Sequence, residues 1–425
     1  MNSLSRWLIV AGWLCASYGA LADLSPAGEP DRPGSGPAVL LARRFPRAGV
    51  DTALGRRVKI DVEDQPLRAF VADSVQQLGV KLELDSEALQ EAHVKPDVPI
   101  TCAVEGITLG AALDWILEPL GLAVVVDGQA LRVTSRERAA RMMVTATYPI
   151  SGVTVPATSD PQSDPVPALC DLIKRVVEPA SWEETSGKGT IQKSSEPKVI
   201  EIFQTPRAHA TIARLFHALH TARSGRQLVS SIELLDQSEL QARFILRRIL
   251  AEKATLDFKN QPLEEVADYL RKRYLVNVEI DRPALAVAGL AADLPINAKI
   301  EGEPLGPSLW SVLVAHKLAY LFRDEMLVIT TPAVAARTME IRVYPVRDLI
   351  KAGKNPDFGP LVQAITQAVN PNGWNPAAGL GMIEPYGPCL ALVVVQTDGA
   401  HGQIAELLAQ RRQPPAPRRP AGLHP

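Results

Sequence analysis

Few side chains in this sequence have the types and spacing that chemistry requires. His217 and His220 are spaced so that both fall on one helix face. A zinc site needs further converging ligands, and His-x-x-His alone does not supply them. Ser151 and Ser181 lie outside any Gly-x-Ser-x-Gly motif, so neither is assigned as a nucleophile. We therefore expect no metal site and no catalytic residue.

Two glycine motifs resemble parts of a phosphate loop. They are Gly187-Lys188-Gly189 and Gly379-Leu380-Gly381. A phosphate loop must open a helix whose amide groups face the anion, whereas a strand-like segment follows each of these motifs. The adjacent carboxylates Glu183-Glu184 fall in a polar stretch typical of a loop. We expect turns at both glycine motifs, no acid–base pair and no bound cofactor.

The cysteines do not form an obvious framework. Cys15 lies in an N-terminal segment that we expect to be removed, which leaves Cys102, Cys170 and Cys389. An odd number of cysteines cannot make a closed set of disulfides. We interpret them as isolated thiols of the core rather than as a redox or metal site.

Composition limits the class of protein. The 425 residues are enough for roughly two to four domains of ordinary size. The chain is 46% hydrophobic and 22% charged, and its formal net charge is −2. Lys and Arg are interleaved with Asp and Glu, so the strong basic excess of a nucleic-acid binder is missing. We expect no nucleic-acid partner.

The N-terminus has the features of an export signal. Arg6 precedes the apolar run Trp7–Leu14, and Ala20-Leu21-Ala22 supplies the small-residue pattern of a cleavage site. We expect cleavage after Ala22. An uncleaved anchor is the alternative, although the apolar run is shorter than the roughly 20 residues of a spanning helix. No later segment is long and apolar enough, so we expect no membrane span in the mature chain.

The rest of the chain is built twice. The stretch Asp61–Leu67 returns as Asp257–Leu263, and this shift of 196 residues (257 − 61) needs no gap until about Ile150 and Val346. After a Pro- and Ser-rich loop that is four residues shorter in the second copy, the shift becomes 192. An internal repeat of this length predicts two copies of the same set of domains.

Each copy begins with a longer unit. Pro66 and Pro262 are predicted in the first turn of a helix, where a missing N–H costs nothing. Apolar residues at three- and four-residue spacing follow and predict one buried helix stripe. The alternation in Val80–Leu84 and Val276–Ile280 predicts strands with one buried face. A further strand and helix lead to a final hairpin with Asp127-Gly128 at its turn.

A smaller unit follows in each copy, with the order strand, helix, two strands, helix. In the first copy Val144–Ile150 opens it. The aligned Trp182 and Trp374 each follow a bend that contains proline, and they either pack over the sheet or anchor a partner. They are the candidate partner contacts. His209 and His401 also coincide, each in the first turn of the closing helix.

These patterns predict an α/β (α+β) protein of four small two-layer domains in tandem. The arrangement is two copies of a βαβ-βαββ domain, each followed by a βαββα domain. The expected segments are a signal peptide (1–22), a disordered linker (23–51), the first longer unit (52–135), the first smaller unit (143–222), a connecting helix (223–250), the second longer unit (251–331), the second smaller unit (339–412) and a disordered tail (413–425).

The longer unit resembles the short N-terminal domain that secretins and TonB-dependent receptors share (the STN domain). The likeness rests on Asp61–Leu67 and, more closely, on Asn260–Val266 and Met326–Thr330, which are similar to that family's "dxpLxevLxxL" opening and "llIt" close. The smaller unit, with Tyr344-Pro345-Val346 and Leu392–Thr397, resembles the ring-building domain that follows the short domain in secretins.

The resemblance implies a periplasmic or envelope location in a Gram-negative-type bacterium and contact with proteins through sheet edges and helix faces. The residues after Arg412 are too few for a secretin's pore-forming domain, so we expect no pore or transport function. We expect an exported, non-enzymatic protein that binds an envelope protein or assembles with itself. The alternative is a glycan-binding protein or a hydrolase-like enzyme with a site between the two copies.

Overall fold

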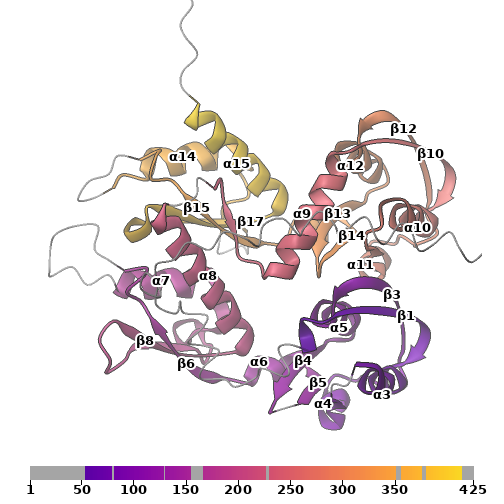
Figure 1. Ribbon diagram of the computed structural model, residues 1–425, viewed down its shortest axis with the longest axis horizontal. Helices are drawn as coiled ribbons and strands as arrows, with labels where there is room; N and C mark the ends of the chain where they lie inside the picture. Colours follow the sequence, from indigo (N-terminus) through magenta and orange to yellow (C-terminus); the bar gives the residue numbers. More distant parts are fainter. Residues whose placement is uncertain are drawn as a thin grey trace, which may run out of the picture. The chain divides into compact units, whose positions relative to one another are not determined.

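The computed structural model describes residues 53–78, 81–128, 130–154, 166–225, 229–350, 356–375 and 380–413. These residues belong to one compact unit. Short helices alternate with small sheets along the chain (Figure 1), which is the predicted mixed α/β class of small two-layer domains. The expected signal peptide 1–22, the linker 23–51 and all but the first residue of the tail 413–425 lie outside the described residues.

Residues 53–141 combine a two-stranded ribbon with a three-stranded sheet. The ribbon pairs β1 with β3, and the sheet has the order β2-β5-β4. Leu67 of α3 and Leu109, Leu113 and Leu117 of α5 are buried, as their helical spacing predicts. The elements are β1 (Arg57–Pro66), α3 (Leu67–Leu78), β2 (Leu82–Leu84), α4 (Ser86–Glu91), β3 (Pro99–Thr108), α5 (Leu109–Leu117), η1 (Glu118–Leu120), β4 (Leu122–Asp127), β5 (Ala130–Ser135) and α6 (Arg136–Arg141).

Residues 253–335 repeat this arrangement at the shift of 196. Ile60 lies opposite Val104 in the first ribbon, and Leu256 lies opposite Ile300 in the second. Both ribbons change register at the same two places. The elements are β10 (Lys253–Pro262), α10 (Leu263–Tyr274), β11 (Val278–Ile280), α11 (Arg282–Val287), β12 (Pro295–Pro304), α12 (Leu305–Ala315), β13 (Ala319–Arg323), β14 (Met326–Thr330) and α13 (Pro332–Ala335).

The prolines at the helix entries lie one position earlier than predicted. Pro66 and Pro262 are the last residues of β1 and β10, and the helices begin at the leucine that follows. The N–H of Leu67 bonds to Val98 O at 2.9 Å, and the N–H of Leu263 bonds to Leu294 O at 2.9 Å. The ring therefore ends the strand, because it fixes φ and offers no N–H to a neighbour.

Two smaller units have the predicted order. Their sheets run β6-β8-β7 and β16-β17-β15-β9. The first unit contains β6 (Val144–Pro149), α7 (Val166–Val176), η2 (Pro179–Ser181), η3 (Glu183–Thr185), β7 (Thr190–Lys193), β8 (Val199–Gln204) and α8 (Pro206–Ser224). The second contains β15 (Glu340–Pro345), α14 (Gly359–Ala368), β16 (Met382–Tyr386), η5 (Gly387–Cys389), β17 (Ala391–Gln396) and α15 (Asp398–Arg412).

One segment precedes the second longer unit, and at the shift of 196 only its end has described equivalents, the helical Ala53 and Leu54. It consists of β9 (Ile232–Glu233) and α9 (Gln237–Ala251). A capping box starts the helix, because Asp236 accepts a bond from the backbone of Glu239 and Glu239 returns one to Asp236. Leu246 and Ile249 turn toward the core of residues 246–329.

The two longer units share buried surface. Leu321, Met326 and Val328 of the β13–β14 hairpin belong to the same hydrophobic core as α5, and Trp115 packs against it. The guanidinium of Arg323 lies over the Trp115 ring at 4.9 Å. This face of the hairpin would be exposed in an isolated two-layer domain, and here the first half covers it.

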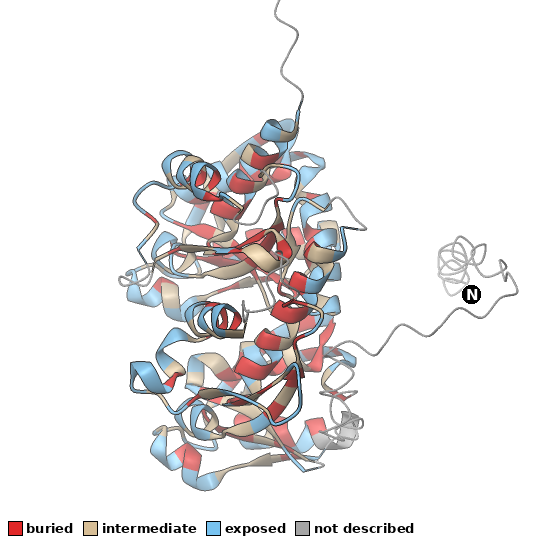
Figure 2. Ribbon diagram, turned by 90° about the vertical axis from the view of Figure 1, so that its left-hand side faces the viewer, coloured by how far each residue is buried: buried red, intermediate tan, exposed pale blue. Residues whose placement is uncertain are grey.

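The two smaller units share buried surface as well. Val343, Ala391 and Val393 join the core that contains α7 and α8 of the first half, whereas Leu392 and Val394 face α14 and α15. The sheet β16-β17-β15-β9 thus has helices on both faces, and the buried residues of these strands and helices are red in Figure 2. A single two-layer unit does not explain this burial.

Substitution of a residue in a polar contact between the halves tests this packing. Thr108 donates from Oγ1 to Glu325 Oε1 at 2.5 Å, and the Glu325 side chain is only 1% exposed. We expect Thr108→Val to lower the free energy of unfolding by about 1–3 kcal/mol, because a buried carboxylate loses a donor. Urea denaturation followed by circular dichroism measures the change. The exposed Thr101→Val on the same strand is the control, and equal effects of the two substitutions would contradict the contact.

Candidate functional site

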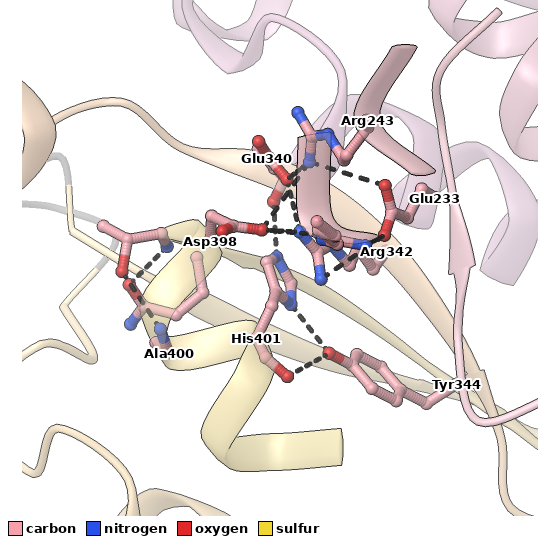
Figure 3. Close-up of polar contacts among 11 residues, drawn as sticks. Glu233, Arg243, Glu340, Arg342, Tyr344, Asp398, Ala400 and His401 are labelled. Carbon is pink, nitrogen blue, oxygen red and sulfur yellow. Dashed lines mark hydrogen bonds and ion pairs between the residues drawn. The ribbon is translucent and has the colours of Figure 1, made fainter. Parts of the chain in front are cut away.

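Six charged side chains from four elements meet in the second half, and all but Arg247 are labelled in Figure 3. The strand β9, the helix α9, the strand β15 and the start of α15 each contribute. Capping by Thr397 begins α15 and places Asp398 in its first turn. The members of this charge cluster are Glu233, Arg243, Arg247, Glu340, Arg342 and Asp398.

Each arginine of the charge cluster bridges at least two carboxylates. Arg243 Nη1 lies 2.7 Å from Glu340 Oε2 and 3.4 Å from Glu233 Oε2. Arg247 contacts Glu233 at 2.7 Å and Asp398 at 2.9 Å. Arg342 donates to Glu340 at 2.7 Å and to Asp398. The contacts tie α9 and β9 to β15 and α15.

Burial and charge act in opposite directions on these groups. Arg243 and Arg342 are 7% and 4% exposed in their side chains. Burial alone would raise the pKa of Glu340 and of Asp398, but the arginines outweigh it and hold both pKa values below their ordinary range. Burial would likewise lower the pKa of Arg342, and the carboxylates instead raise it. Glu340 and Asp398 are therefore ionised beside the Arg243 and Arg342 guanidinium groups.

A histidine and a tyrosine lie beside the charge cluster. His401 Nε2 donates to Glu340 O at 3.0 Å, and its Nδ1 lies 2.9 Å from the Tyr344 hydroxyl, which donates to it. Burial, aided by the charge of Arg342, lowers the pKa of His401 to about 4. The first half has the same pair, with Tyr148 Oη 2.8 Å from His209 Nδ1. The aligned histidines thus hold the closing helix to the first strand.

The charge cluster itself is not repeated. At the shifts of 196 and 192, Glu340, Arg342 and Asp398 correspond to Val144, Ala146 and Pro206. Because its carboxylates already pair with guanidinium groups, the charge cluster is suited to fix α9 rather than to move a proton. Arg342 Nε and Glu233 Oε2 are buried without a hydrogen-bond partner in the described part of the chain, so ionic contact contributes much of the attraction.

A pocket of about 610 Å³ lies next to the charge cluster. Tyr320 stands edge-on to Trp310 with ring centroids 5.8 Å apart, and Arg247 lies over the Phe322 ring at 5.8 Å. Aromatic and proline side chains dominate the wall, and two charged groups lie at its border. The pocket is lined by Arg247, Leu250, Ala251, Pro304, Gly306, Pro307, Trp310, Tyr320, Phe322 and Asp398.

Exposed apolar side chains continue from this pocket. Nine large apolar side chains are exposed among the described residues, and five of them lie on α9 or α12. Phe244 shares a helix face with Arg247 and Ala251, because residues three, four and seven apart align on a helix. Phe244 is 69% exposed and Trp310 is 47% exposed. We call the pocket with Leu240, Phe244, Trp310 and Val314 the α9–α12 surface.

The predicted tryptophan contacts lie elsewhere. Trp182 is buried, and its indole N–H donates to Val177 O at 2.8 Å. Trp374 is half-buried, and its indole N–H donates to Val369 O at 2.7 Å. Both rings pack over their sheets, one of the two alternatives drawn from the sequence. Contact of the remaining Trp374 surface with a partner stays a prediction.

The other candidate residues stand apart from the α9–α12 surface. A Cβ at Gly187 would lie 2.1 Å from the Ser181 carbonyl carbon, so this glycine serves a close backbone approach at a turn. Burial raises the pKa of Cys102 and of Cys389 to about 12, as for thiols of a core. In the described residues no three His, Cys, Asp or Glu side chains gather as metal ligands. His217 and His220 are exposed on α8.

The α9–α12 surface could not be predicted from the comparison of the two sequence copies, for a physical reason. Comparison of the two copies favours positions that recur, and Trp310 corresponds to Asp114. One signal was available, because Leu305–Ala315 carries no charged residue although a helix on a two-layer domain can bury only one stripe. Such a helix must meet another element or expose apolar surface, and here it does both.

Removal of one arginine tests the charge cluster. We expect Arg342→Ala to lower the free energy of unfolding by about 3–5 kcal/mol, because it leaves buried carboxylates without their partner. Chemical denaturation measures the loss. The matched control is Arg175→Ala, which breaks an exposed pair with Glu384 and should cost less than about 1 kcal/mol. If both variants lose the same stability, the charge cluster is not a buried ionic clamp.

The histidine gives a pH dependence of known sign. The folded state keeps His401 neutral down to a pKa of about 4, whereas the unfolded chain protonates it near 6.5. The unfolded state therefore binds more protons in this window, and stability falls as the pH drops from 6.5 toward 4, by up to about 3 kcal/mol from this residue.

We expect His401→Gln to flatten that slope. Unfolding free energies at a series of pH values provide the measurement. His217→Gln is the control, because this exposed side chain on α8 lies outside the Tyr344–His401 pair. A slope that survives His401→Gln would show that another group titrates.

No helix in the described ranges combines the length and the apolar character that a membrane crossing requires. No protein-family model matches the chain, and no curated protein does.

Several solved structures show a limited likeness. The InvG N0–N1 region in the Salmonella SPI-1 injectisome is 15% identical, with 39% of this chain and 94% of that chain covered and a TM-score of 0.18. The V. cholerae type IV competence pilus secretin PilQ is 17% identical, with 38% of each chain covered and a TM-score of 0.15. The N-terminal domain of the Pseudomonas aeruginosa secretin XcpQ is 11% identical, with 84% of this chain and all of that chain (100%) covered and a TM-score of 0.15. TM-scores of this size do not establish a shared overall fold.

Proposed function

We propose that this chain is a non-enzymatic envelope protein that binds another protein through the α9–α12 surface. The observation that carries the proposal is the Trp310 ring, half exposed over an aromatic pocket and close to a second exposed apolar stripe on α9. Contiguous exposed apolar patches on a folded protein mark interaction sites. Tryptophan is among the residues that most often supply binding energy at such sites.

The charge cluster supports this role because it fixes the surface before a partner arrives. Arg247 belongs both to the charge cluster and to the pocket wall, and Asp398 does as well. Ionic contacts to β15 and α15 therefore hold α9 against α12. A surface already held in its binding conformation loses less conformational entropy when a partner docks.

The chemistry of the surface suits a polypeptide partner. The pocket accepts an apolar or aromatic side chain, while Arg247 and the exposed Arg248 provide a basic border. A buried aromatic anchor with a polar rim is the usual anatomy of a protein interface. We expect the partner to present an apolar side chain flanked by acidic residues. From the N-terminal signal we infer export to the periplasm or cell envelope, so we expect the partner in the same compartment. A second copy of this chain is one such partner.

Substitutions at the surface test the proposal. We expect Trp310→Ala and Phe244→Ala each to weaken partner binding by roughly 30-fold, which corresponds to about 2 kcal/mol at an interface hot spot. The measurement is a cross-linking pull-down from envelope extract with the purified chain, followed by titration of the captured protein. The control Val287→Ala removes an apolar side chain that is 92% exposed on α11.

The outcomes separate the function classes. Retained binding by both surface variants would move the interface elsewhere, and a lone monomer without a captured protein would contradict the binding role. The aromatic pocket also keeps the glycan-binding alternative testable, because aromatic rings present flat apolar faces to a ligand. A rise in melting temperature on addition of oligosaccharides, lost in Trp310→Ala, would favour that alternative.

A further inference from the structure

The second half fills one edge of its sheet with a segment of its own chain. The strand β9 pairs antiparallel with β15, with Glu233 opposite Arg342 and Ile232 opposite Val343. The N–H of Leu234 extends the ladder to Ile341 O at 3.3 Å. An edge strand offers unpaired backbone groups to any extended segment. Here the connector between the halves occupies them.

The first half leaves the same edge open. The strand β6 corresponds to β15, and within the described residues it pairs with β8 alone. At the shift of 196, Thr145 and Thr147 take the places of Ile341 and Val343. The register of the second half therefore directs the N–H and C=O groups of Thr145 and Thr147 to the open side.

The sequence of β6 does not protect this edge. Val144–Tyr148 consists of strand-forming residues and alanine and carries no charge. The proline of β6, Pro149, is its last residue, and the equivalent Pro345 ends β15, which still pairs with β9. Other outer strands carry the usual protection. The strand β16 contains Glu384 and Pro385, and β7 ends at Lys193. Proteins guard exposed edges with charges, prolines or short strands, so an unguarded edge with intact strand propensity suits strand addition.

The first half differs in sequence at the positions that align with β9. At the shift of 196, Ile232 and Glu233 correspond to Gly36 and Pro37. Glycine weakens a strand, and proline cannot donate to a ladder. Among the residues that the structure describes, no strand takes the place of β9 beside β6.

We propose that the open edge of β6 binds an extended segment of a partner polypeptide, antiparallel to β6, with an apolar residue opposite Ala146. The pairing of β9 with β15 in the second half is the template for this contact. There, Arg342 lies 3.6 Å from the Glu233 carboxylate and also pairs with Asp398, whereas Ala146 and Pro206 stand at the positions of Arg342 and Asp398 in the first half. A carboxylate opposite Ala146 would have no charged partner from these positions, and an apolar side chain is favoured.

The proposal for the β6 edge depends on the proposed function in one respect only, namely that the partner is a polypeptide. The α9–α12 surface belongs to the second half, so loss of binding at Trp310 leaves the β6 edge intact. The two tests can therefore fail independently.

Two peptides serve as probes. One has the sequence Val229–Asp236 of this chain, and the other carries Glu233→Leu within that sequence. We expect the second peptide to bind the full chain about tenfold more tightly, because the change removes an uncompensated charge. Amide NMR signals report the site. Binding should slow the hydrogen exchange of the Thr145 and Thr147 amides, which face solvent in the free protein.

Thr147→Pro removes one donor from the edge and should abolish peptide binding. Thr147→Val keeps the backbone groups and should retain it, and circular dichroism confirms that both variants fold. Equal affinity of the two peptides, equal binding by both variants, or signal changes at Ile341 and Val343 instead of Thr145 and Thr147 would overturn the proposal. Absence of binding at millimolar peptide would overturn it too.

Discussion

Coverage of the second-half sheet on both faces is the constraint on which the rest of the structure depends. Along β17, Leu392 and Val394 face α14 and α15, and Ala391 and Val393 face α7 and α8 of the first half. An apolar strand of this kind needs helices on two sides. The first-half sheet has no such need, because Thr145, Thr147 and Glu201 occupy its outer face. The two smaller units therefore pack as a pair, and one face of the second-half sheet completes the core of the first half.

The contact between the longer units is equally asymmetric. In the second half the hairpin offers Glu325 and Val328 to the first half, whereas Gln129 and Arg132 stand at those positions of the first-half hairpin. Arg132 forms an ion pair with Asp127 at 2.7 Å on the hairpin's own surface. The receiving side has changed as well, since Thr108, which donates to Glu325, corresponds to Pro304. Gln129 and Pro304 cannot repeat the Thr108–Glu325 bond, so a third longer unit could not pack in the same way. The two units therefore end the array, as capping units do in repeat proteins.

The sequence allowed the repeat, the order of elements and the hairpins to be predicted, because periodicity and turn chemistry are local properties. It did not reveal which face of β14 meets another domain. Met326–Thr330 is apolar at four consecutive positions, which fits a strand buried on two faces. The sequence of a strand does not indicate which other element covers it. The charge cluster was missed because Arg342 and Asp398 are ordinary surface residues until β9 and α9 fold over them. The recurrence of His209 and His401 was visible, and only the fold shows that each ring bonds a tyrosine.

What differs between the copies therefore carries more functional information than what recurs. Selection on a scaffold retains the Tyr–His pairs and the ribbon registers, since both halves need them to fold. The charge cluster, the α9–α12 surface and the filled edge of β15 all belong to one half and all depend on the connector. Once that connector occupied one sheet edge and exposed Phe244 beside Trp310, the halves could no longer bind the same partner in the same way. Among the described residues, one half presents an apolar surface beside buried ions and the other a strand edge without a neighbour, and these are the two unlike docking sites that we propose.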